Sequence, residues 1–395
     1  MKFIKTCLQI VFGVRPSPGA AVSATKMGWK LRTCSPRREL LWPGTAALRI
    51  SLALLPLFAL CSCAAPKSAA PSNPLGVRIT QTNDTLRVEL NGKLFTEYYY
   101  TNVPRPFCYP IIGPGGVAMT RNFPMAKVPG EEFDHPHHRS LWFGHGPVNG
   151  VDVWTEKATT GRIRHRGFAD ISSGVNEGFI KTLNDWVAPD GKVLCSDEQT
   201  VRFRAPTNGV ITLDFEITIH ASNGDVTFGD SKEGSFAIRV AESMRVLQPM
   251  KRGEPARAGK GHIVLSTGER DNGVSAAAAK DAKREAVTWG KRAAWCDYYG
   301  PVDDKIVGFA ILDHPSNPRH PTWWHVRDYG LFAANPFGQH DFESLKDHHA
   351  GDLKIAAGQS ITFRYRVIIH EGDEKQARIA AHFEEFAKTK SPSAK

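Results

Sequence analysis

The chain is poor in cysteine and lacks several short motifs that mark common catalytic sites. Only seven of its 395 residues are cysteine, and three of these lie beyond position 63, namely Cys108, Cys195 and Cys296. Three thiols form at most one bridge, so a disulfide-stapled scaffold is excluded, and no Cys-x-x-C pair is present to bind zinc. The sequence contains no Gly-rich phosphate loop, no G-x-S-x-G elbow and no H-E-x-x-H helix, so nothing indicates the chemistries that those motifs support.

The body of the chain also lacks a basic excess, although the whole chain carries a formal charge of +10. Residues 1–62 hold nine of the 50 basic residues and one of the 40 acidic ones, which leaves +2 for the remainder. A nucleic-acid groove needs clustered positive charge in the folded part, so nucleic acid is not an expected partner. A content of 41% hydrophobic and 23% charged residues is typical of a globular protein.

The basic N-terminal segment has the parts of a secretory signal. Its apolar run at 50–60 is about 11 residues long, too short for a membrane span of roughly 20. The run ends in Leu60-Cys61-Ser62-Cys63-Ala64, which resembles the bacterial lipobox with Leu60 at −3 and Ser62 at −1 from Cys63. We therefore expect lipidation at Cys63, with Cys61 as the second candidate and an ordinary cleaved signal as the alternative.

The domain organisation and the cell address follow from this leader. A start at Met27 would give a leader of more usual length, and the Ala/Pro/Ser-rich stretch behind Cys63 has the composition of a tether. We predict a leader at 1–62, a tether at 63–75 and a single β-sandwich domain at 76–395. The protein is then a lipoprotein of the cell envelope, periplasmic or in the outer membrane, that contacts the membrane only through its N-terminal lipid.

The body shows the two-residue periodicity of half-buried strands. Leu86–Leu90 and Leu94–Tyr100 flank an Asn-Gly turn, which is a strong hairpin signal. Every second residue is apolar from Val210 to His220 and again from Ile361 to Ile369. Apolar residues at helical spacing occur at Glu374–Lys388. We predict an all-β fold, a large antiparallel β-sandwich with a C-terminal helix, for which the galactose-mutarotase-like supersandwich is one candidate architecture.

The densest group of ionisable residues lies at 134–145, which holds four of the 15 histidines. In an extended chain His135 and His137 point to the same side, and a third ligand would complete a divalent-metal site. Neutral imidazoles are also suitable general bases near pH 7. A polar turn whose histidines cap backbone groups is the structural alternative.

A second group lies at 313–330, behind an apolar strand, and three prolines keep its first half out of regular structure. Trp324 could stack on a sugar ring, His325 and Asp328 could serve as acid and base, and Arg327 could bind an anion. Packing tryptophans with ordinary ion pairs are the alternative. Two further polar turns, at 229–236 and 335–342, contain Glu233, a candidate acid–base group, and His340.

The segments Asp134–Phe143 and Val148–Trp154, together with Trp324–Gly330 and Ala334–Gly338, resemble a bacterial family of unknown function that is often labelled "methane oxygenase PmoA". The resemblance spans most of 85–372. Members look like secreted proteins of bacteria that degrade complex carbohydrate, which implies a sugar ligand by association. A membrane methane-oxidising subunit needs several apolar spans of about 20 residues, and the body has no run of half that length, so we expect no methane oxidation.

We therefore predict a secreted lipoprotein that acts on carbohydrate by His/carboxylate acid–base chemistry, of hydrolase, lyase or epimerase type, with or without a divalent metal. The alternatives are a non-catalytic carbohydrate-binding lipoprotein and a structural envelope protein. The residues expected in catalysis are His137, His138, His325, Asp328 and Glu233. Those expected to bind substrate are Arg139, Trp142, Trp324, Arg327 and Asn335. Those expected to bind the metal are His135, His137 and His340.

Overall fold

The computed structural model describes residues 75–248, 257–274 and 286–390. The predicted leader, the Met27 start, the lipidation site Cys63 and all of the tether except Leu75 lie outside the described residues. No helix in the described part of the chain combines the length and the apolar character needed to cross a membrane.

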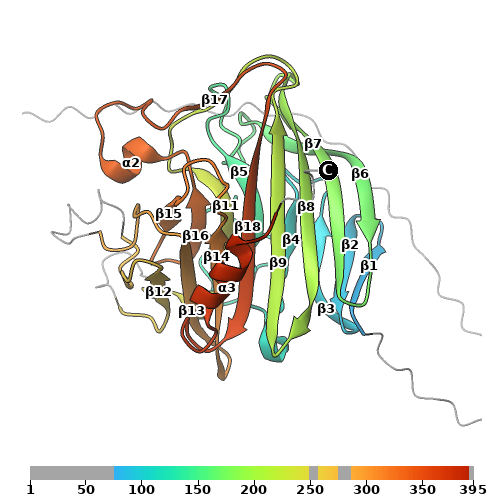
Figure 1. Ribbon diagram of the computed structural model, residues 1–395, viewed down its shortest axis with the longest axis vertical. Helices are drawn as coiled ribbons and strands as arrows, with labels where there is room; N and C mark the ends of the chain where they lie inside the picture. The colour runs from blue at the N-terminus through green and yellow to red at the C-terminus, as the bar shows by residue number, and fades with distance from the viewer. Residues whose placement is uncertain (1–74, 249–256, 275–285, 391–395) are drawn as a thin grey trace, which may run out of the picture. The chain divides into compact units, whose positions relative to one another are not determined.

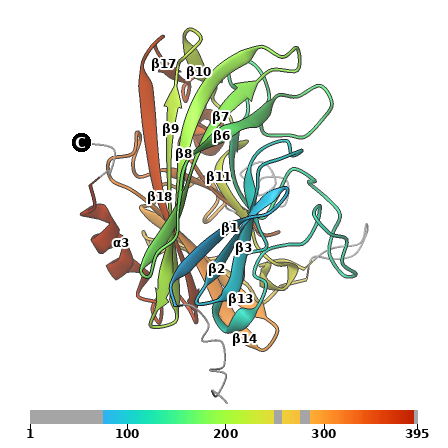
Figure 2. The same ribbon diagram turned by 90° about the vertical axis from the view of Figure 1, so that its right-hand side faces the viewer.

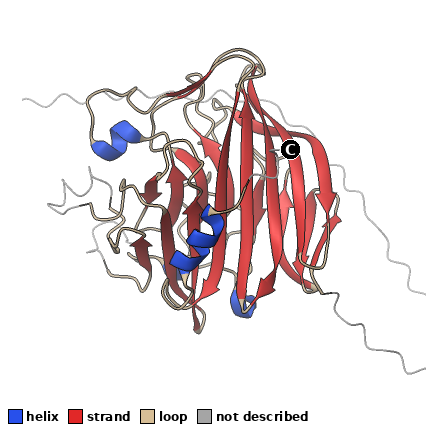
Figure 3. Ribbon diagram, in the orientation of Figure 1, coloured by secondary structure: helices blue, strands red, loops and turns tan. Residues whose placement is uncertain are grey.

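Two eight-stranded antiparallel sheets dominate the described chain (Figures 1 and 3). The first sheet contains, in spatial order, β1 (Val77–Gln81), β2 (Thr85–Leu90), β3 (Lys93–Tyr99), β4 (Phe107–Tyr109), β5 (Leu141–His145), β11 (Gly234–Arg239), β16 (Leu331–Asn335) and β15 (Trp323–Val326). The second contains β12 (His262–Leu265), β13 (Trp295–Val302), β14 (Lys305–Asp313), β18 (Ser360–Glu371), β9 (Val210–His220), β8 (Val193–Thr207), β7 (Glu177–Val187) and β6 (Arg162–Ser172).

Smaller elements join these sheets. A two-stranded ribbon pairs β10 (Val226–Phe228) with β17 (Leu353–Ile355). Short 3₁₀ turns occur at η1 (Pro114–Gly116) and η2 (Glu242–Met244). The described α-helices are α2 (Gln339–Glu343) and α3 (Ile379–Ala387).

The alternation in the sequence is the alternation of burial in the structure. Along β9 the residues switch between partly exposed and buried at each step, and Ile217 and Ile219 are fully buried. The predicted hairpin is β2–β3, and both turn residues have positive φ, 50° at Asn91 and 72° at Gly92, as a type I′ turn requires. The sandwich with its C-terminal helix is therefore confirmed.

The helix α3 begins later than its sequence pattern suggests. Residues 374–377 form turns, and Arg378 adopts the left-handed conformation with φ of 54° directly before Ile379. The predicted apolar positions still point inward, since Ile379 and Phe386 are buried against the second sheet.

The core lies between the two sheets, which Figure 2 shows from the side. Aromatic rings cross from one sheet to the other: Phe236 of the first sheet stacks on Tyr365 and Phe215 of the second, with centroid distances of 5.0 and 4.6 Å. These contacts remove large apolar areas from water and fix the two sheets face to face. The opposite face of the first sheet carries a separate cluster that includes Trp142 and Trp154.

Candidate functional site

The pairing of the strands brings segments that are distant in the sequence together on the outer face of the first sheet, which is the face opposite the core. Opposed residues form one row across five strands, in the order Phe107, Trp142, Ala237, Ala333 and His325. Side chains of directly opposed residues share a face, so the segments around 142 and 325 belong to one surface of one sheet. The sequence could not show this, because the strands between them pair non-sequentially.

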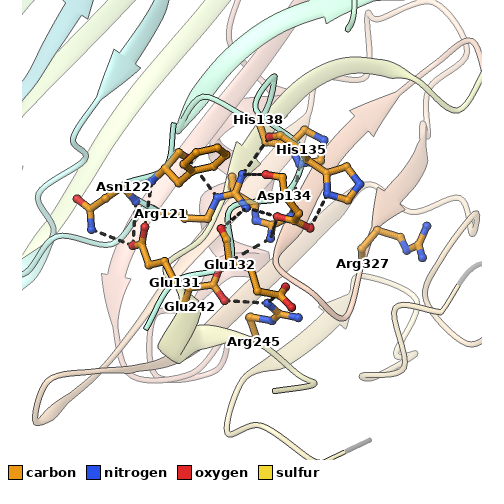
Figure 4. A network of polar contacts seen from close by, with 12 residues as sticks. Arg121, Asn122, Glu131, Glu132, Asp134, His135, His138, Glu242, Arg245 and Arg327 are labelled. Atoms are coloured by element: carbon orange, nitrogen blue, oxygen red, sulfur yellow. Dashed lines mark hydrogen bonds and ion pairs between the residues drawn. The ribbon is translucent and has the colours of Figure 1, made fainter. Parts of the chain in front are cut away.

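A network of arginines and carboxylates lies beside this row (Figure 4). The fully buried Arg121 forms an ion pair with Asp134 and donates hydrogen bonds to the carbonyl oxygens of Asp134 and His135. Arg239, on β11 and also fully buried, approaches Asp134 at 3.4 Å and Glu242 at 3.8 Å. Buried cations need such partners, and together they hold the 134–138 turn in place.

Asp134 orients His135. The Oδ2 atom of Asp134 lies 2.5 Å from Nδ1 of His135. Burial would raise the pKa of Asp134, but the hydrogen bond from His135 and the charges of Arg239 and Arg121 outweigh burial and hold the pKa well below its usual range. Asp134 is therefore ionised and accepts a hydrogen bond from the Nδ1–H group of His135. This leaves Nε2 of His135 as the outward-facing nitrogen.

His138 is buried and neutral. Burial, and next the charge of Arg239, hold its pKa well below the ordinary value. Its Nδ1 is 3.4 Å from an N–H donor of Arg239, and its ring stacks on Trp142 with centroids 5.5 Å apart. Only 1% of His138 is exposed, so its ring packs beneath the neighbouring histidines and is poorly placed to contact a ligand.

His137, like His135, is partly exposed. No hydrogen bond to either of its ring nitrogens occurs within the described part of the chain. Burial, followed by the positive charge of Arg105, lowers its pKa to about 3, so the ring is neutral. Its ring centroid lies 5.7 Å from that of His135 and 4.5 Å from that of His138. A neutral imidazole with a lone pair to offer is a candidate base.

His325 is a third neutral imidazole, at the far end of the row. Its Nδ1 lies 2.6 Å from the carbonyl oxygen of Lys232. A carbonyl only accepts, so Nδ1 carries the hydrogen and Nε2 carries the lone pair. Nε2 is buried without a partner among the described residues, and burial, then the charge of Arg327, hold the pKa of His325 well below its usual value.

Arg327 and Tyr329 complete the cluster. The guanidinium of Arg327 lies over the Tyr329 ring, 4.9 Å from its centroid, and Nε donates to the carbonyl oxygen of Gly273 at 3.2 Å. The same ring stacks on His135, with centroids 5.3 Å apart. Arg327 is thus next to the Asp134–His135 pair and remains partly exposed.

Several predicted substrate contacts are structural instead. Trp324 is fully buried in the sandwich core, where its Nε1 donates to the carbonyl oxygen of Ala293. Trp142 is 1% exposed and lies beneath His138, and Asn335 is fully buried and bonded to Ser231. Burial argues against substrate contact for all three, since Trp324 faces the core, while Trp142 and Asn335 lie on the outer face and are covered by other residues.

Arg139 is also already occupied. Its guanidinium forms a two-point ion pair with Glu156, with Nε–Oε1 at 2.8 Å and Nη2–Oε2 at 2.7 Å. Glu156 also lies 3.9 Å from the buried Arg105, which donates to the carbonyl oxygen of Trp154. The expected role of Arg139 in substrate binding is therefore corrected to anchoring the loop that covers Trp154.

The expected metal set does not assemble. Among the described residues no three His, Cys, Asp or Glu side chains are arranged to hold a metal ion, so His135, His137 and His340 do not form one site. His340 instead lies 3.2 Å from the buried Asp230 and against the ring of His348. The partners of His340 belong to the 230 and 341–348 segments, and none of them belongs to the 134–138 turn.

Two predicted acid–base residues lie at the margin. Glu233 is partly exposed and pairs with Lys232 at 3.2 Å. Asp328 fixes a turn through its backbone, since its carbonyl oxygen accepts the N–H groups of Val246 and Leu247. Neither contacts His137 through a hydrogen bond in the described residues.

The most important groups that sequence reasoning missed are buried cations. Arg105, Arg121 and Arg239 position the histidine turn, yet Arg105 and Arg121 stand in irregular segments with no pattern to mark them. Arg239 did carry a signal, since it interrupts the apolar run at 236–240. A charged residue is almost never fully buried in a strand unless it is paired, so its presence there indicates a specific role.

Comparison with known proteins places these residues in a family. Residues 85–384 match DUF6807, which is described as a family of unknown function. No curated protein matches the sequence. Among solved structures, an aldose epimerase (GalM) homologue from C. elegans is similar at 8% identity and a TM-score of 0.29, over 75% of this chain and 99% of that one. That similarity is too low to carry an argument, so function is argued from the side chains alone.

Proposed function

This chain belongs to DUF6807, a family of unknown function, and we propose that it is an enzyme that acts on carbohydrate by histidine acid–base chemistry at the outer face of the first sheet. The observation that carries the proposal is His137, a neutral, partly exposed imidazole without a hydrogen-bond partner in the described chain, next to a histidine that a carboxylate orients.

His137 is the proposed base. Its lone pair is available because burial and Arg105 keep the ring unprotonated. With a pKa of about 3, His137 is a weak base at neutral pH when no substrate is bound. An anionic or electron-rich substrate would raise the pKa of His137 towards neutral pH, where a general base is most effective.

His135 is the proposed acid. Asp134 orients its ring through Nδ1, as a carboxylate orients a catalytic histidine. A base and an acid whose rings lie 5.7 Å apart can take a proton from one side of a sugar carbon and give one to another atom. This favours a lyase or epimerase type of reaction over a hydrolase.

A non-catalytic carbohydrate-binding lipoprotein is the competing proposal. Such modules present aromatic rings to the sugar, but Trp142, Trp154 and Trp324 are each at most 1% exposed. We also propose the lipid anchor at Cys63 and a location in the cell envelope; incorporation of labelled fatty acid into wild type and into Cys63→Ala tests them, and equal labelling would contradict the anchor.

Exchange of solvent deuterium into sugars tests the acid–base proposal, because both lyases and epimerases remove a carbon-bound proton. We expect exchange or product formation with at least one sugar of a neutral and acidic panel, and a loss of about 10²–10⁴ in kcat/KM for His137→Ala. His220→Ala, on β9 of the second sheet, is the matched control and should retain activity. Equal turnover in both variants would remove His137 from the mechanism.

A further inference from the structure

The geometry points to an acidic carbohydrate as the substrate class, with the sugar carboxylate held by the guanidinium of Arg327. This inference rests on the proposed function and specifies the ligand of that site. It depends on the orientation of Arg327, on the distribution of charge around Tyr329 and on the lone pair of His325.

Two contacts orient the guanidinium of Arg327, and its remaining edge has no carboxylate partner among the described residues. One face of the guanidinium rests on Tyr329, and Nε is bonded to the carbonyl oxygen of Gly273. Gly273 packs so tightly there that an added Cβ would lie 2.5 Å from the backbone nitrogen of Asp328. No carboxylate of the described residues pairs with Arg327, and Figure 4 shows no interaction from it to the residues drawn. An oriented guanidinium fork matches a carboxylate at two points.

Among the described residues, Arg327 is the arginine of this network that forms no ion pair, although the carboxylate of Glu233 also acts on Tyr329. Tyr329 contacts two guanidinium groups, that of Arg239 at 4.8 Å and that of Arg327 at 4.9 Å from the ring centroid. Arg239 is balanced by Asp134 and Glu242. The other arginines are also paired: Arg121 with Asp134, Arg139 with Glu156, and Arg245 with Glu132 and Glu242. An anion bound at Arg327 would give this guanidinium an ionic partner.

His325 supplies an independent polar atom for the same ligand. It lies two residues before Arg327, which directly follows β15, and the charge of Arg327 acts on the His325 ring. Its Nε2 is buried, lacks a partner among the described residues and carries a lone pair. A sugar hydroxyl adjacent to the carboxylate could donate to that atom. A neutral apolar ligand would leave both His325 and Arg327 unsatisfied.

A bound carboxylate also makes the proposed chemistry easier. When a base removes the proton on the carbon next to the carboxylate, the electron pair spreads into that group, and the growing charge faces Arg327. In an elimination the pair then forms a carbon–carbon double bond while the bond to the neighbouring ring-substituent oxygen breaks, and that oxygen takes a proton from the acid. In an epimerisation the proton returns to the opposite side of the same carbon. Neither route needs another reactant.

Calorimetric binding with matched ligands tests the inference. The probes are galacturonate, glucuronate, the methyl ester of each, and galactose 6-sulfate, with the full-length protein and with Arg327→Ala and Arg327→Lys. Arg292→Ala is the matched control, because Arg292 also stacks on an aromatic ring, Trp323 at 4.5 Å, but donates to two carbonyl groups. Circular dichroism of each variant verifies that it folds.

We expect at least one uronate to bind about tenfold more tightly than its ester, a difference typical of a charge-assisted hydrogen bond. Arg327→Ala should abolish that difference without weakening ester binding, Arg327→Lys should retain only part of it, and Arg292→Ala should retain it in full. Equal affinity for acid and ester, tighter binding of the sulfate, no binding of any probe, or a preference that survives Arg327→Ala would overturn the inference.

Binding and turnover separate this inference from the proposed function. A uronate preference that depends on Arg327 without turnover of any sugar would support the acidic-ligand site and contradict catalysis. His137-dependent turnover of neutral sugars with no preference for the carboxylate would support catalysis and overturn the acidic-ligand site.

Discussion

Three histidines of the site, His137, His138 and His325, share one electrostatic state although they come from two segments. All three have lowered pKa values, because burial disfavours the charged ring and a nearby arginine adds to the effect. Neutral histidines next to a guanidinium that pairs with no carboxylate of the described residues give a site suited to accept protons and bind negative charge.

The tautomer of His325 can be measured directly. We expect nitrogen NMR at neutral pH to show hydrogen on Nδ1 and a bare Nε2, because the carbonyl oxygen of Lys232 accepts from Nδ1. The signals should stay in the neutral form well below pH 6, unlike those of an exposed histidine, whose pKa is about 6.5. A protonated Nε2 at neutral pH would contradict the arrangement and remove His325 as an acceptor for a sugar hydroxyl.

At the scale of elements, the period-2 pattern was sufficient to locate strands and insufficient to orient them. The pattern at 210–220 coincides with β9, and that at 361–369 lies within β18. In β15 and β16, by contrast, all residues are buried, because one face meets the core and loops cover the other. The sequence therefore shows no polar side there, and which of Trp324 and His325 faces the core could not be assigned in advance.

Substitutions on the two faces of β9 test this reading of the strand. Ile217→Ala should lower the free energy of unfolding by about 2–5 kcal/mol, because the side chain is fully buried in the core and its removal leaves a cavity. Thr212→Ala, on the partly exposed face of the same strand, should change it by no more than about 0.5 kcal/mol. Urea unfolding measures both, and similar losses would contradict the assignment of faces.

At the scale of the whole molecule, burial of neutral histidines ties stability to pH. A histidine whose pKa is lower in the folded state binds fewer protons there than in the unfolded chain, so its contribution is present above the unfolded pKa and is lost as the pH falls. His137 and His138 belong to this class, as does the buried His145, whose pKa burial lowers to about 4. Asp197 acts in the opposite sense, since burial raises its pKa to about 7.

We expect the histidines to outweigh Asp197, so that stability falls between about pH 6.5 and pH 4, with a slope of up to about 1.4 kcal/mol per pH unit for each histidine. Urea unfolding across this range is the measurement. Asp197→Asn should steepen the loss, because it removes the group that opposes it, whereas stability that stays constant or rises towards pH 4 would contradict the pKa directions.

The sequence by itself determined the fold class, the principal strands, the near-neutral body and the two candidate segments, at 134–145 and 313–330. These properties are local, since alternation, turn residues and charge are encoded by neighbours along the chain. Only the tertiary structure decided which residues meet, because the register of non-sequential strands sets Trp142 and His325 in one row. It also decided their chemistry: burial made His137, His138 and His325 neutral, an ion pair occupied Arg139, and Tyr329 came to stack on Arg327, the group that we propose binds the ligand.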